Sequence, residues 1–401
     1  MKALLIAKHW PEPNATAAGR RTFDILNVLS NFEIHAACGG AISEHCERLE
    51  QQNISCYQIK LNDQSFNDFI QDLNPDLVIY DRFMIEEQFS WRVRQTCPNA
   101  MTILDTSDLH SLRYARHVAL NSAQELNLNN DIALREIASI QRTDLTLMIS
   151  SVEMRILQEH FKIDSNKIHY FPFVIDCDAI EPELPNFEQR ANVMMIGNFL
   201  HEPNWDAARF AVQSIWPLVR KQLPQLELHI YGAYSSDKHQ QLHQPKLGIH
   251  LKGHCENALS TFKQYRINLA PLRFGAGQKG KVLEGWLTGT ATIGSPIALE
   301  SMTFDEDLGY RPSIEPKQIA RQIQAAYSDS NYFNQLVDSG FTQLTNHFDN
   351  KEHSPALKIK ITEHLTHLEL NRANDFYQQL LWQKQFRAEQ YLSKWIEEKN
   401  K

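Results

Sequence analysis

A chain of 401 residues with a net charge of −8 and 42% hydrophobic residues has the composition of an ordinary globular protein. At this length two domains are the default expectation. The acidic balance argues against a general nucleic-acid-binding protein, and no apolar run is long enough to span a bilayer. The six cysteines are scattered without a CxxC pair, which predicts a reduced, cytosolic chain with no disulfide framework and no zinc site.

Short apolar runs alternate with amphipathic stretches along the chain, a pattern typical of parallel sheets with crossover helices. We expect strands in the first half at 3–7, 34–38, 54–59, 77–80, 101–104, 145–149 and 168–171, and in the second half at 193–196, 226–231, 249–251, 267–270 and 290–293. Helical patterns between them include 22–30, 66–73, 151–161, 205–222 and 279–288.

These two sets of elements predict two doubly wound α/β domains, with a boundary where the prolines after Glu181 interrupt any regular pattern. Residues 108–142 are interpreted as one long helix, and the chain is expected to be helical after about residue 315. The aromatic side chains of the last helix, among them Phe376, Phe386, Tyr391 and Trp395, are expected to be packed inside, because large apolar side chains are mostly buried. A partner-binding face is the alternative.

The most informative segment runs from Leu269 to Glu284 and combines a strand end, a glycine-rich turn and the start of a helix. Backbone N–H groups at a helix N-terminus favour an anion, and glycines allow a phosphate to approach closely. Lys279 and Lys281 add positive charge where a cation is unfavourable unless an anion binds. Glu284 is placed either to bind sugar hydroxyls or to pair with Lys281 on the helix surface. The glycines of the turn are Gly275, Gly277 and Gly280.

This segment resembles the donor-binding loop of GT-B glycosyltransferases, in particular the family 4-like group (glycosyl transferases group 1). The resemblance covers roughly residues 1–345 and is strongest over 190–302. It implies two Rossmann-like domains facing across a cleft: an acceptor-side domain at 1–180 and a donor-binding domain at 190–345, with C-terminal helices at 346–401 that cross back to the first domain. Further segments that resemble the family are 194–206, 228–232, 251–254 and 104–113.

The resemblance also implies roles for the charged residues of this loop. Lys279 or Lys281 would neutralise the β-phosphate of the donor and the charge that develops on the leaving group. Glu284 would bind the ribose hydroxyls. Ala276 stands where many members have a second glutamate, so the sugar specificity of the better-known branch does not carry over. No arginine or lysine follows Gly197 closely, which leaves the two lysines to meet the phosphate charge.

Two further regions resemble loops that approach the donor, and each has a simpler alternative. Gly19 and Arg20, with Arg21 beside them, match the first-domain loop near the donor phosphate, or else form an exposed basic turn. Asn204 lies near the donor phosphate or sugar, or else only caps the helix that follows it.

Three more donor-side candidates follow the strands of the second domain. Gly232 ends a strand and either lines the ligand crevice or makes an ordinary turn. His254 lies in the turn whose backbone is expected to contact the nucleotide base. Arg273 either points into the cleft or pairs with an acidic surface group.

On the acceptor side, Asp108 and His110 follow a buried strand, at the carboxyl end where open α/β sheets place ligands. His110 is expected to contact the transferred sugar. Asp108 either joins it or, like Ser107, caps the next helix. The resemblance implies retention through front-face attack, which needs no protein nucleophile, so His110 is not assigned as a general base. Asp81 and Arg82 end another strand and are candidates for lining the acceptor site.

We therefore expect a cytosolic, retaining glycosyltransferase that uses a nucleotide-diphosphate sugar and requires no metal or other cofactor. Its acceptor would be a glycan, a lipid-linked sugar or another glycoconjugate, since bacterial relatives build cell-surface polysaccharide. Nucleic acid is not expected as a partner. A peripheral contact with the inner face of a membrane, with Trp10, Arg82 and Phe83 as candidates, and the oligomeric state stay open. A non-catalytic nucleotide-sugar-binding or scaffold protein is the main alternative, followed by an epimerase or a phosphorylase.

Overall fold

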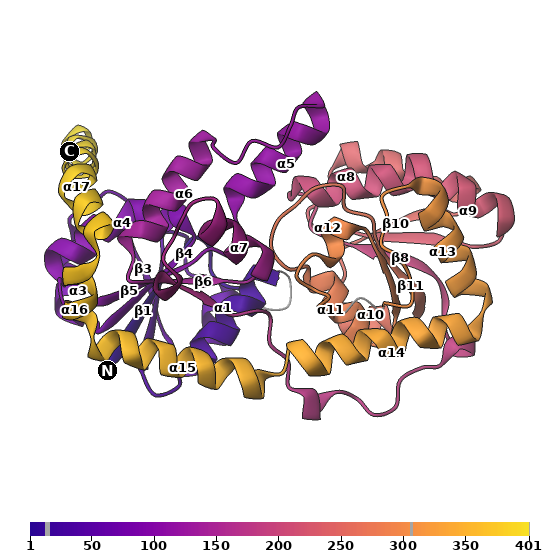
Figure 1. The fold of residues 1–401 in the computed structure, drawn as a ribbon, viewed down its shortest axis with the longest axis horizontal. Helices are drawn as coiled ribbons and strands as arrows, with labels where there is room; N and C mark the ends of the chain where they lie inside the picture. The colour runs from indigo at the N-terminus through magenta and orange to yellow at the C-terminus, as the bar shows by residue number, and fades with distance from the viewer. Residues whose placement is uncertain (13–16, 305–307, 401) are drawn as a thin grey trace. The chain divides into compact units, whose positions relative to one another are not determined.

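The computed structural model describes residues 1–12, 17–304 and 308–400. The chain divides into two compact units, each with its own parallel sheet (Figure 1). The first unit comprises Met1–Leu112, Asn127–Pro172 and Glu352–Lys401, and the second comprises Arg113–Leu126 and Phe173–Lys351. The domain boundaries expected from the sequence stay predictions.

Within the described residues, seven parallel strands form the sheet of the first unit, in the order β3-β2-β1-β4-β5-β6-β7. The central strands β4, β5 and β6 are buried along their whole length, so they occur in the sequence as mostly apolar runs. The strands are β1 (Lys2–Ala7), β2 (Glu33–Cys38), β3 (Ser55–Gln58), β4 (Leu77–Asp81), β5 (Met101–Asp105), β6 (Leu145–Met148) and β7 (Ile168–Tyr170).

The second unit has a smaller parallel sheet, with five strands among the described residues in the order β10-β9-β8-β11-β12. They are β8 (Ala191–Ile196), β9 (Leu228–Tyr231), β10 (Ile249–Gly253), β11 (Tyr265–Ala270) and β12 (Ala291–Gly294). Every strand expected from the sequence is found with its ends displaced by at most two residues, which confirms the α/β class.

Helices pack against both sheets (Figure 1). Those numbered α1 to α7 are α1 (Ala17–Val28), α2 (Glu44–Glu50), α3 (Ser65–Leu73), α4 (Phe83–Thr96), α5 (His110–Ser122), α6 (Asp131–Arg142) and α7 (Ser151–Glu159). The others are α8 (Glu202–Phe210), α9 (Trp216–Gln222), α10 (Ala258–Phe262), α11 (Gly280–Leu287), α12 (Pro296–Leu299), α13 (Pro316–Ser328), α14 (Ser330–His347), α15 (Asn350–Thr366), α16 (Leu368–Asn374) and α17 (Phe376–Lys399).

The helical stretch over 205–222 is interrupted by a π-helical turn, and Pro217 accounts for it. Helix α8 continues through a π-helical turn, Ala211–Ile215, into α9. A proline has no N–H to bond to the preceding turn, and its ring crowds the carbonyl four residues earlier. The wider π-helical turn accommodates that ring while the chain stays helical.

The prediction of one long helix over 108–142 is wrong. Helix α5 ends at Ser122, and α6 begins only at Asp131, after Asn130 has capped it. The Asn130 side chain accepts a hydrogen bond from the Ala133 N–H at 3.1 Å, and its amide donates to the Ser111 carbonyl. Asparagine is among the preferred N-cap residues, and this signal was present in the sequence.

The C-terminal helices, whose helical character is confirmed, are attached to the first unit by buried polar contacts. Arg372 of α16 forms a two-pronged ion pair with Asp144, at 2.8 and 2.6 Å. Gln378 of α17 donates to the same carboxylate, and Lys167 pairs with Asp375 at 2.5 Å. Burial opposes ionisation of Asp144, but the Arg372 guanidinium and these hydrogen bonds hold the pKa of Asp144 below its usual value.

The expectation that the aromatic side chains of the last helix are packed inside is wrong for Phe376, Tyr391 and Trp395, whereas Trp382 is only partly exposed and lies against the Arg94 guanidinium. Phe376, Tyr391 and Trp395 are 69, 67 and 60% exposed, and Phe386 lies outside the described side chains. Helix α17 instead contacts the first unit through polar groups such as Glu397, which pairs with Arg92. Among the described residues, no helix combines the length and apolar character needed to cross a membrane.

We expect Arg372→Met to lower the free energy of unfolding by about 3 kcal/mol or more, because it leaves the buried Asp144 carboxylate without its partner. Urea unfolding at pH 7 measures this loss. The pKa of Asp144 is lowered in the folded wild type, so the pair contributes stability above the unfolded pKa of about 4 and loses it as the pH falls further. The loss of unfolding free energy in the variant, relative to the wild type, should therefore become smaller in acid.

The double variant Asp144→Asn/Arg372→Met serves as the control. It should recover part of the lost free energy of unfolding, and no recovery would contradict this account.

Candidate functional site

The glycine-rich turn after β11 requires glycine at two positions. Gly275 has φ of 151° and Gly277 has φ of 68°, both in the region that side chains disfavour. A Cβ on Gly275 would meet Lys279 only at ordinary contact distance, 3.6 Å, so the requirement there is conformational. Gly280 is the first residue of α11, and the turn therefore leads directly into the helix N-terminus, as the sequence predicts.

Lys279 is the N-cap residue of α11, and its side chain folds back over the turn. It is buried, with 9% of its surface exposed, and its Nζ donates hydrogen bonds to the carbonyls of Ala276 (2.9 Å) and Gly277. The ammonium group thus stabilises the turn and places positive charge at the positive end of the helix dipole.

Lys281 lies in the first turn of α11 and donates from Nζ to Asn204 Oδ1 at 2.8 Å. Burial lowers the pKa of Lys281 to about 8; the Glu284 carboxylate opposes this shift, and the charge of Lys279 adds to it. Glu284 itself is half-buried. The structure therefore places all three charged residues expected from the sequence on the first turns of one helix.

The expectation that Asn204 caps the helix after it is wrong. Helix α8 starts earlier, at Glu202, with His201 in the cap position. The Asn204 amide donates instead to the Asn198 carbonyl at 2.9 Å while its oxygen accepts from Lys281. Gly197 makes this possible, because a Cβ there would lie 2.6 Å from Asn204 Cγ. Asn204 thus joins the loop after β8 to the start of α11.

Of the two alternatives for Arg273, the structure shows the ion pair. Its Nε lies 2.9 Å from Asp206 Oδ2, and a second guanidinium nitrogen also donates to this carboxylate. The guanidinium lies 5.1 Å from the centre of the Phe210 ring. Arg273 therefore connects the donor loop to α8 through contacts within the protein.

Gly232 has a packing role at the end of β9. A Cβ on this residue would lie 2.0–2.6 Å from atoms of the Phe199 ring, which covers the strand end and stacks on His239. His254 is exposed, and it follows Gly253, where a Cβ would meet nothing within 4 Å. The space beside Gly253 is therefore open.

Arg116 of α5 is a contact of the donor loop that the sequence analysis missed. Within the second unit its guanidinium donates to the Gly275 carbonyl at 2.8 Å and forms a bidentate pair with Glu300 at 2.8 and 2.7 Å. Beside it, His117 stacks on Phe274 with ring centres 4.7 Å apart. Arg116 is far from this loop along the chain, so no local spacing could have indicated the contact.

In the first unit, His110 and Asp108 lie together at the start of α5. His110 Nε2 is 3.3 Å from Asp108 Oδ1, and the Phe83 ring packs edge-on against the imidazole. The amides of His110 and Ser111 donate to the buried carboxylate of Glu136, from α6, at 2.9 and 3.0 Å. Burial raises the pKa of Glu136, opposed by His110 and Ser111. Glu136 holds His110 in place and was missed because 108–142 was interpreted as a single helix.

In the first unit, the backbone of Glu12, after β1, passes very close to Gly19 of α1. A Cβ on Gly19 would lie 2.4 Å from the Glu12 carbonyl oxygen, so only glycine fits. Arg20, next to it, is half-buried. Arg21 is buried, pairs with Asp105 at 2.8 Å and also donates to the Phe171 carbonyl. The anion that Arg21 meets is thus a carboxylate of this chain.

Arg82, at the carboxyl end of β4, has a backbone conformation that is almost restricted to glycine, with φ of 74° and ψ of 159°. Its N–H donates to the Asp105 carbonyl at 2.8 Å, and Asp81 accepts from the Lys8 N–H at 3.1 Å. The ends of β1, β4 and β5 are therefore tied together here. Strain of this kind often accompanies function.

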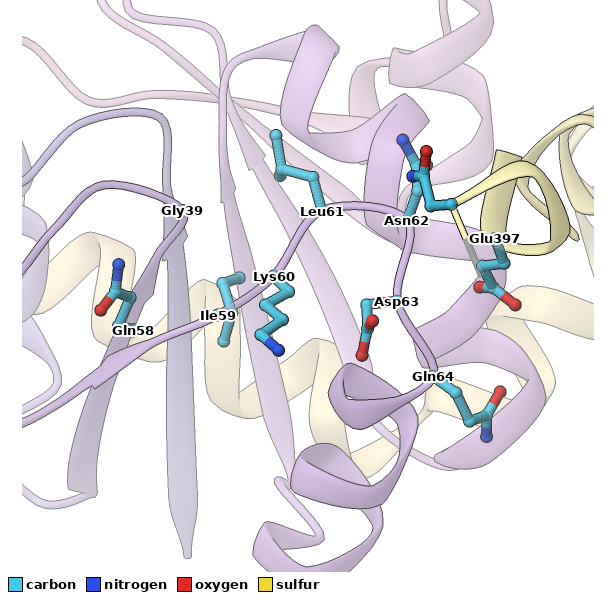
Figure 2. Close-up of a pocket in the computed structure, with 10 residues that line it drawn as sticks. Gly39, Gln58, Ile59, Lys60, Leu61, Asn62, Asp63, Gln64 and Glu397 are labelled. Atoms are coloured by element: carbon cyan, nitrogen blue, oxygen red, sulfur yellow. The ribbon is translucent and has the colours of Figure 1, made fainter. Parts of the chain in front are cut away.

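A pocket of about 660 Å³ lies elsewhere in the first unit, at the carboxyl ends of β2 and β3 (Figure 2). Its lining carries both signs of charge, from Lys60, Asp63 and Glu397. None of the site residues expected from the sequence lines it. The remaining lining residues are Gly39, Gln58, Ile59, Leu61, Asn62, Gln64 and Asn400.

Comparison with known protein families gives a match to the segment that contains the glycine-rich turn. Residues 190–329 match the family model described as Glycosyl transferases group 1. No match was found among curated protein sequences.

Solved structures resemble the chain over nearly its whole length. A glycosyltransferase from Rickettsia africae is 13% identical, with a TM-score of 0.65, over 91% of this chain and 98% of that one. Alr3699/HepE from Anabaena, in complex with UDP and glucose, is 12% identical with a TM-score of 0.65, over 91% and 99%. WaaG, a glycosyltransferase involved in lipopolysaccharide biosynthesis, is 12% identical with a TM-score of 0.62, over 90% and 100%. At these identities the likeness shows the fold alone.

We expect Arg82→Gly to be more stable than Arg82→Ala by about 1 kcal/mol or more, because only glycine adopts this backbone conformation without strain. Both variants remove the guanidinium, so their difference isolates the backbone effect. Thermal and urea unfolding of the two variants measure it. Equal stability of the two would show that Arg82 stores no strain.

Proposed function

We propose that this chain transfers a sugar from a nucleoside-diphosphate sugar to a carbohydrate or lipid-linked acceptor. The chain carries a group 1 glycosyl transferases domain on the GT-B fold. This confirms the family, fold and class of enzyme expected from its sequence. The donor would bind to the second unit, at the start of α11. The acceptor would bind to the first unit.

The observation that carries this proposal is the pair of ammonium groups at the start of α11. Lys279 and Lys281 both lie where the helix dipole already favours negative charge, and burial lowers the pKa of Lys281 to about 8. A helix N-terminus disfavours cations, and burial disfavours the charged form of Lys281, so a bound anion would stabilise both ammonium groups. A diphosphate would supply that anion, and the lysines would stabilise the charge that grows on the leaving phosphate. This charge neutralisation supports transfer without a metal ion.

The residues around the lysines support binding of the rest of the donor. Glu284 lies about one turn into α11, where its carboxylate would accept hydrogen bonds from the ribose hydroxyls. Gly275 and Gly277 keep the turn free of side chains, so the backbone would approach the phosphates closely. Asn204, which bonds to Lys281, would lie beside the phosphate. The open backbone near His254 would contact the base.

On the acceptor side, His110 would contact the transferred sugar, oriented by Asp108 and by the Glu136 carboxylate behind it. Gly19 and Arg20 would approach the donor phosphate from the first loop. We propose retention of the anomeric configuration on the strength of the family resemblance, with the leaving phosphate guiding front-face attack. WaaG acts in lipopolysaccharide biosynthesis, which makes a lipid-linked acceptor and a peripheral membrane contact reasonable parts of the proposal.

A thermal-shift screen against UDP, GDP, ADP and CMP tests the donor site, with UDP first because HepE was solved with it. A nucleotide at about 100 times its dissociation constant should add about 2.7 kcal/mol of stability. Glu284→Ala and the double variant Lys279→Ala/Lys281→Ala should lose this shift. Lys317→Ala is the matched control, because Lys317 also lies in the first turn of a helix, α13, but without a glycine-rich turn before it. Absence of a shift with every nucleotide, on folded protein, would refute the donor site.

The same protein then separates a transferase from a scaffold. Hydrolysis or transfer of the donor sugar whose nucleotide gives the shift should occur with the wild type and fall by at least tenfold in the lysine double variant. A nucleotide shift without any turnover, across a panel of glycan and lipid-linked acceptors, would favour the non-catalytic alternative.

Lys281 also predicts a pH dependence. Its pKa in the free protein is lowered to about 8, so the side chain is charged below that pH and loses its proton above it. Donor kcat/KM, which reports the free enzyme, should therefore fall as the pH rises through about 8. Lys281→Arg keeps the charge at every accessible pH and should remove this fall. An identical alkaline profile for wild type and variant would assign the fall to another group.

A further inference from the structure

The second unit holds a cluster of three side chains that the proposed transfer reaction does not use: Glu227, His229 and His250. One ligand atom from each lies within 4.8 Å of the others, and they are the one such group of histidine, cysteine and acidic side chains found among the described residues. We propose that this Glu-His-His cluster binds a divalent transition-metal ion, with Zn²⁺ as the best-matched candidate.

Strand geometry explains why the three side chains converge. His229 of β9 and His250 of β10 are register partners on neighbouring parallel strands, so their side chains leave the same face of the sheet. Glu227 precedes His229 by two residues and therefore points to that face as well. Its Oε2 lies 2.8 Å from His229 Nε2, and its Oε1 lies 3.5 Å from His250 Nε2.

These separations suit a tetrahedral ion. Zn²⁺ binds imidazole nitrogen and carboxylate oxygen at about 2.0–2.2 Å, so neighbouring ligand atoms lie roughly 3.3–3.5 Å apart. One ligand atom from each of the three residues lies within 4.8 Å of the others, so side-chain rotations would bring the three atoms to that spacing. Mixed nitrogen and oxygen ligands suit zinc and its neighbours in the transition series rather than calcium or magnesium. Three protein ligands leave the fourth position for water.

A tyrosine hydroxyl lies behind His229, where it would accept from the second ring nitrogen of a metal-bound histidine. His229 Nδ1 is 2.7 Å from the Tyr265 hydroxyl, which is in turn 2.8 Å from the Tyr231 hydroxyl. Metal-bound histidines commonly use the second ring nitrogen in this way, which fixes the orientation of the ring. Because an ionised Glu227 only accepts, His229 Nε2–H donates to it in the metal-free protein, and the neutral ring accepts from Tyr265 at Nδ1. An ion at Nε2 would require the other tautomer, in which Nδ1–H donates to the Tyr265 hydroxyl.

Access and position also fit. His229 is buried, but His250 and Glu227 are partly exposed, with side chains 24 and 42% accessible, so an ion would reach the cluster from solvent. The cluster lies at the first residues of β9 and β10. The glycine-rich loop proposed to bind the donor follows the last residue of β11. Because the strands are parallel, the cluster lies at their amino ends and this loop at their carboxyl ends, on opposite ends of the sheet.

The first unit contains a natural comparison. Glu33 and His35 on β2 have the same Glu-x-His spacing and the same carboxylate–imidazole bond, at 3.0 Å. The register partners of His35 are Leu4 and Ser55, however, and neither is a metal ligand of this kind. A Glu-x-His pair alone is therefore explained by its hydrogen bond, whereas the cross-strand histidine distinguishes the cluster in the second unit.

The test is a Zn²⁺ titration of the untagged full-length protein after chelator treatment, by isothermal calorimetry and by thermal shift. We expect one high-affinity ion per chain and a rise in Tm. Glu227→Gln and His250→Ala change the more exposed members of the cluster, and each should weaken binding at least tenfold. Glu33→Gln is the matched control and should bind zinc within twofold of the wild type.

Two results would overturn the proposal. One is zinc affinity of the wild type no greater than that of His250→Ala. The other is an equal loss in Glu33→Gln and Glu227→Gln, which would mean that the affected ion binds elsewhere. The inference is independent of sugar transfer: Glu227→Gln should keep the thermal shift given by the nucleotide, so failure of either idea leaves the other standing.

Discussion

The concentration of positive charge at the start of α11 is the constraint on which the proposed donor site depends. The helix dipole is positive there, and Lys279 and Lys281 add two ammonium groups whose protons are shared among Asn204 and the carbonyls of the turn. A phosphate bound at this helix end, as proposed, would add an anion where both the dipole and the two ammonium groups favour one.

Close packing beneath the helix fixes where those charges lie. A Cβ on Gly285 would be 2.4 Å from Thr292 Oγ1 and 2.7 Å from Asn268 Nδ2, so α11 lies directly against β11 and β12. The Asn268 amide also donates to the Lys281 carbonyl at 3.0 Å. The strand thus positions the backbone that carries the lysine. A larger residue at position 285 would displace the helix and, with it, the charge that the proposed donor site requires.

The sequence predicts best what is local. Strands, the glycine-rich turn and the grouping of Lys279, Lys281 and Glu284 follow from periodicity and spacing within a few residues. Contacts that join distant segments do not: Arg116 reaches the Gly275 carbonyl, and Glu136 binds the start of α5, only because of how the chain folds. The exposed face of α17 was misjudged for a related reason. Burial of an aromatic side chain depends on which face of its helix is docked, and here polar pairs such as Arg372 with Asp144 hold the adjoining segment.

Because its strands are parallel, all their amino ends lie at one end of the second sheet and all their carboxyl ends at the other. Strand β10 runs between these two chemically different ends. His250 at its start belongs to the proposed metal cluster, and Gly253 at its end adjoins the backbone proposed to contact the base. As an edge strand, β10 is paired only with β9 among the described strands, and an isolated bridge between Ile249 and Gln244 also holds it. An ion shared by His229 and His250 would join β9 to β10 at their first residues, away from the end proposed to contact the base, so the two sites are expected to act independently.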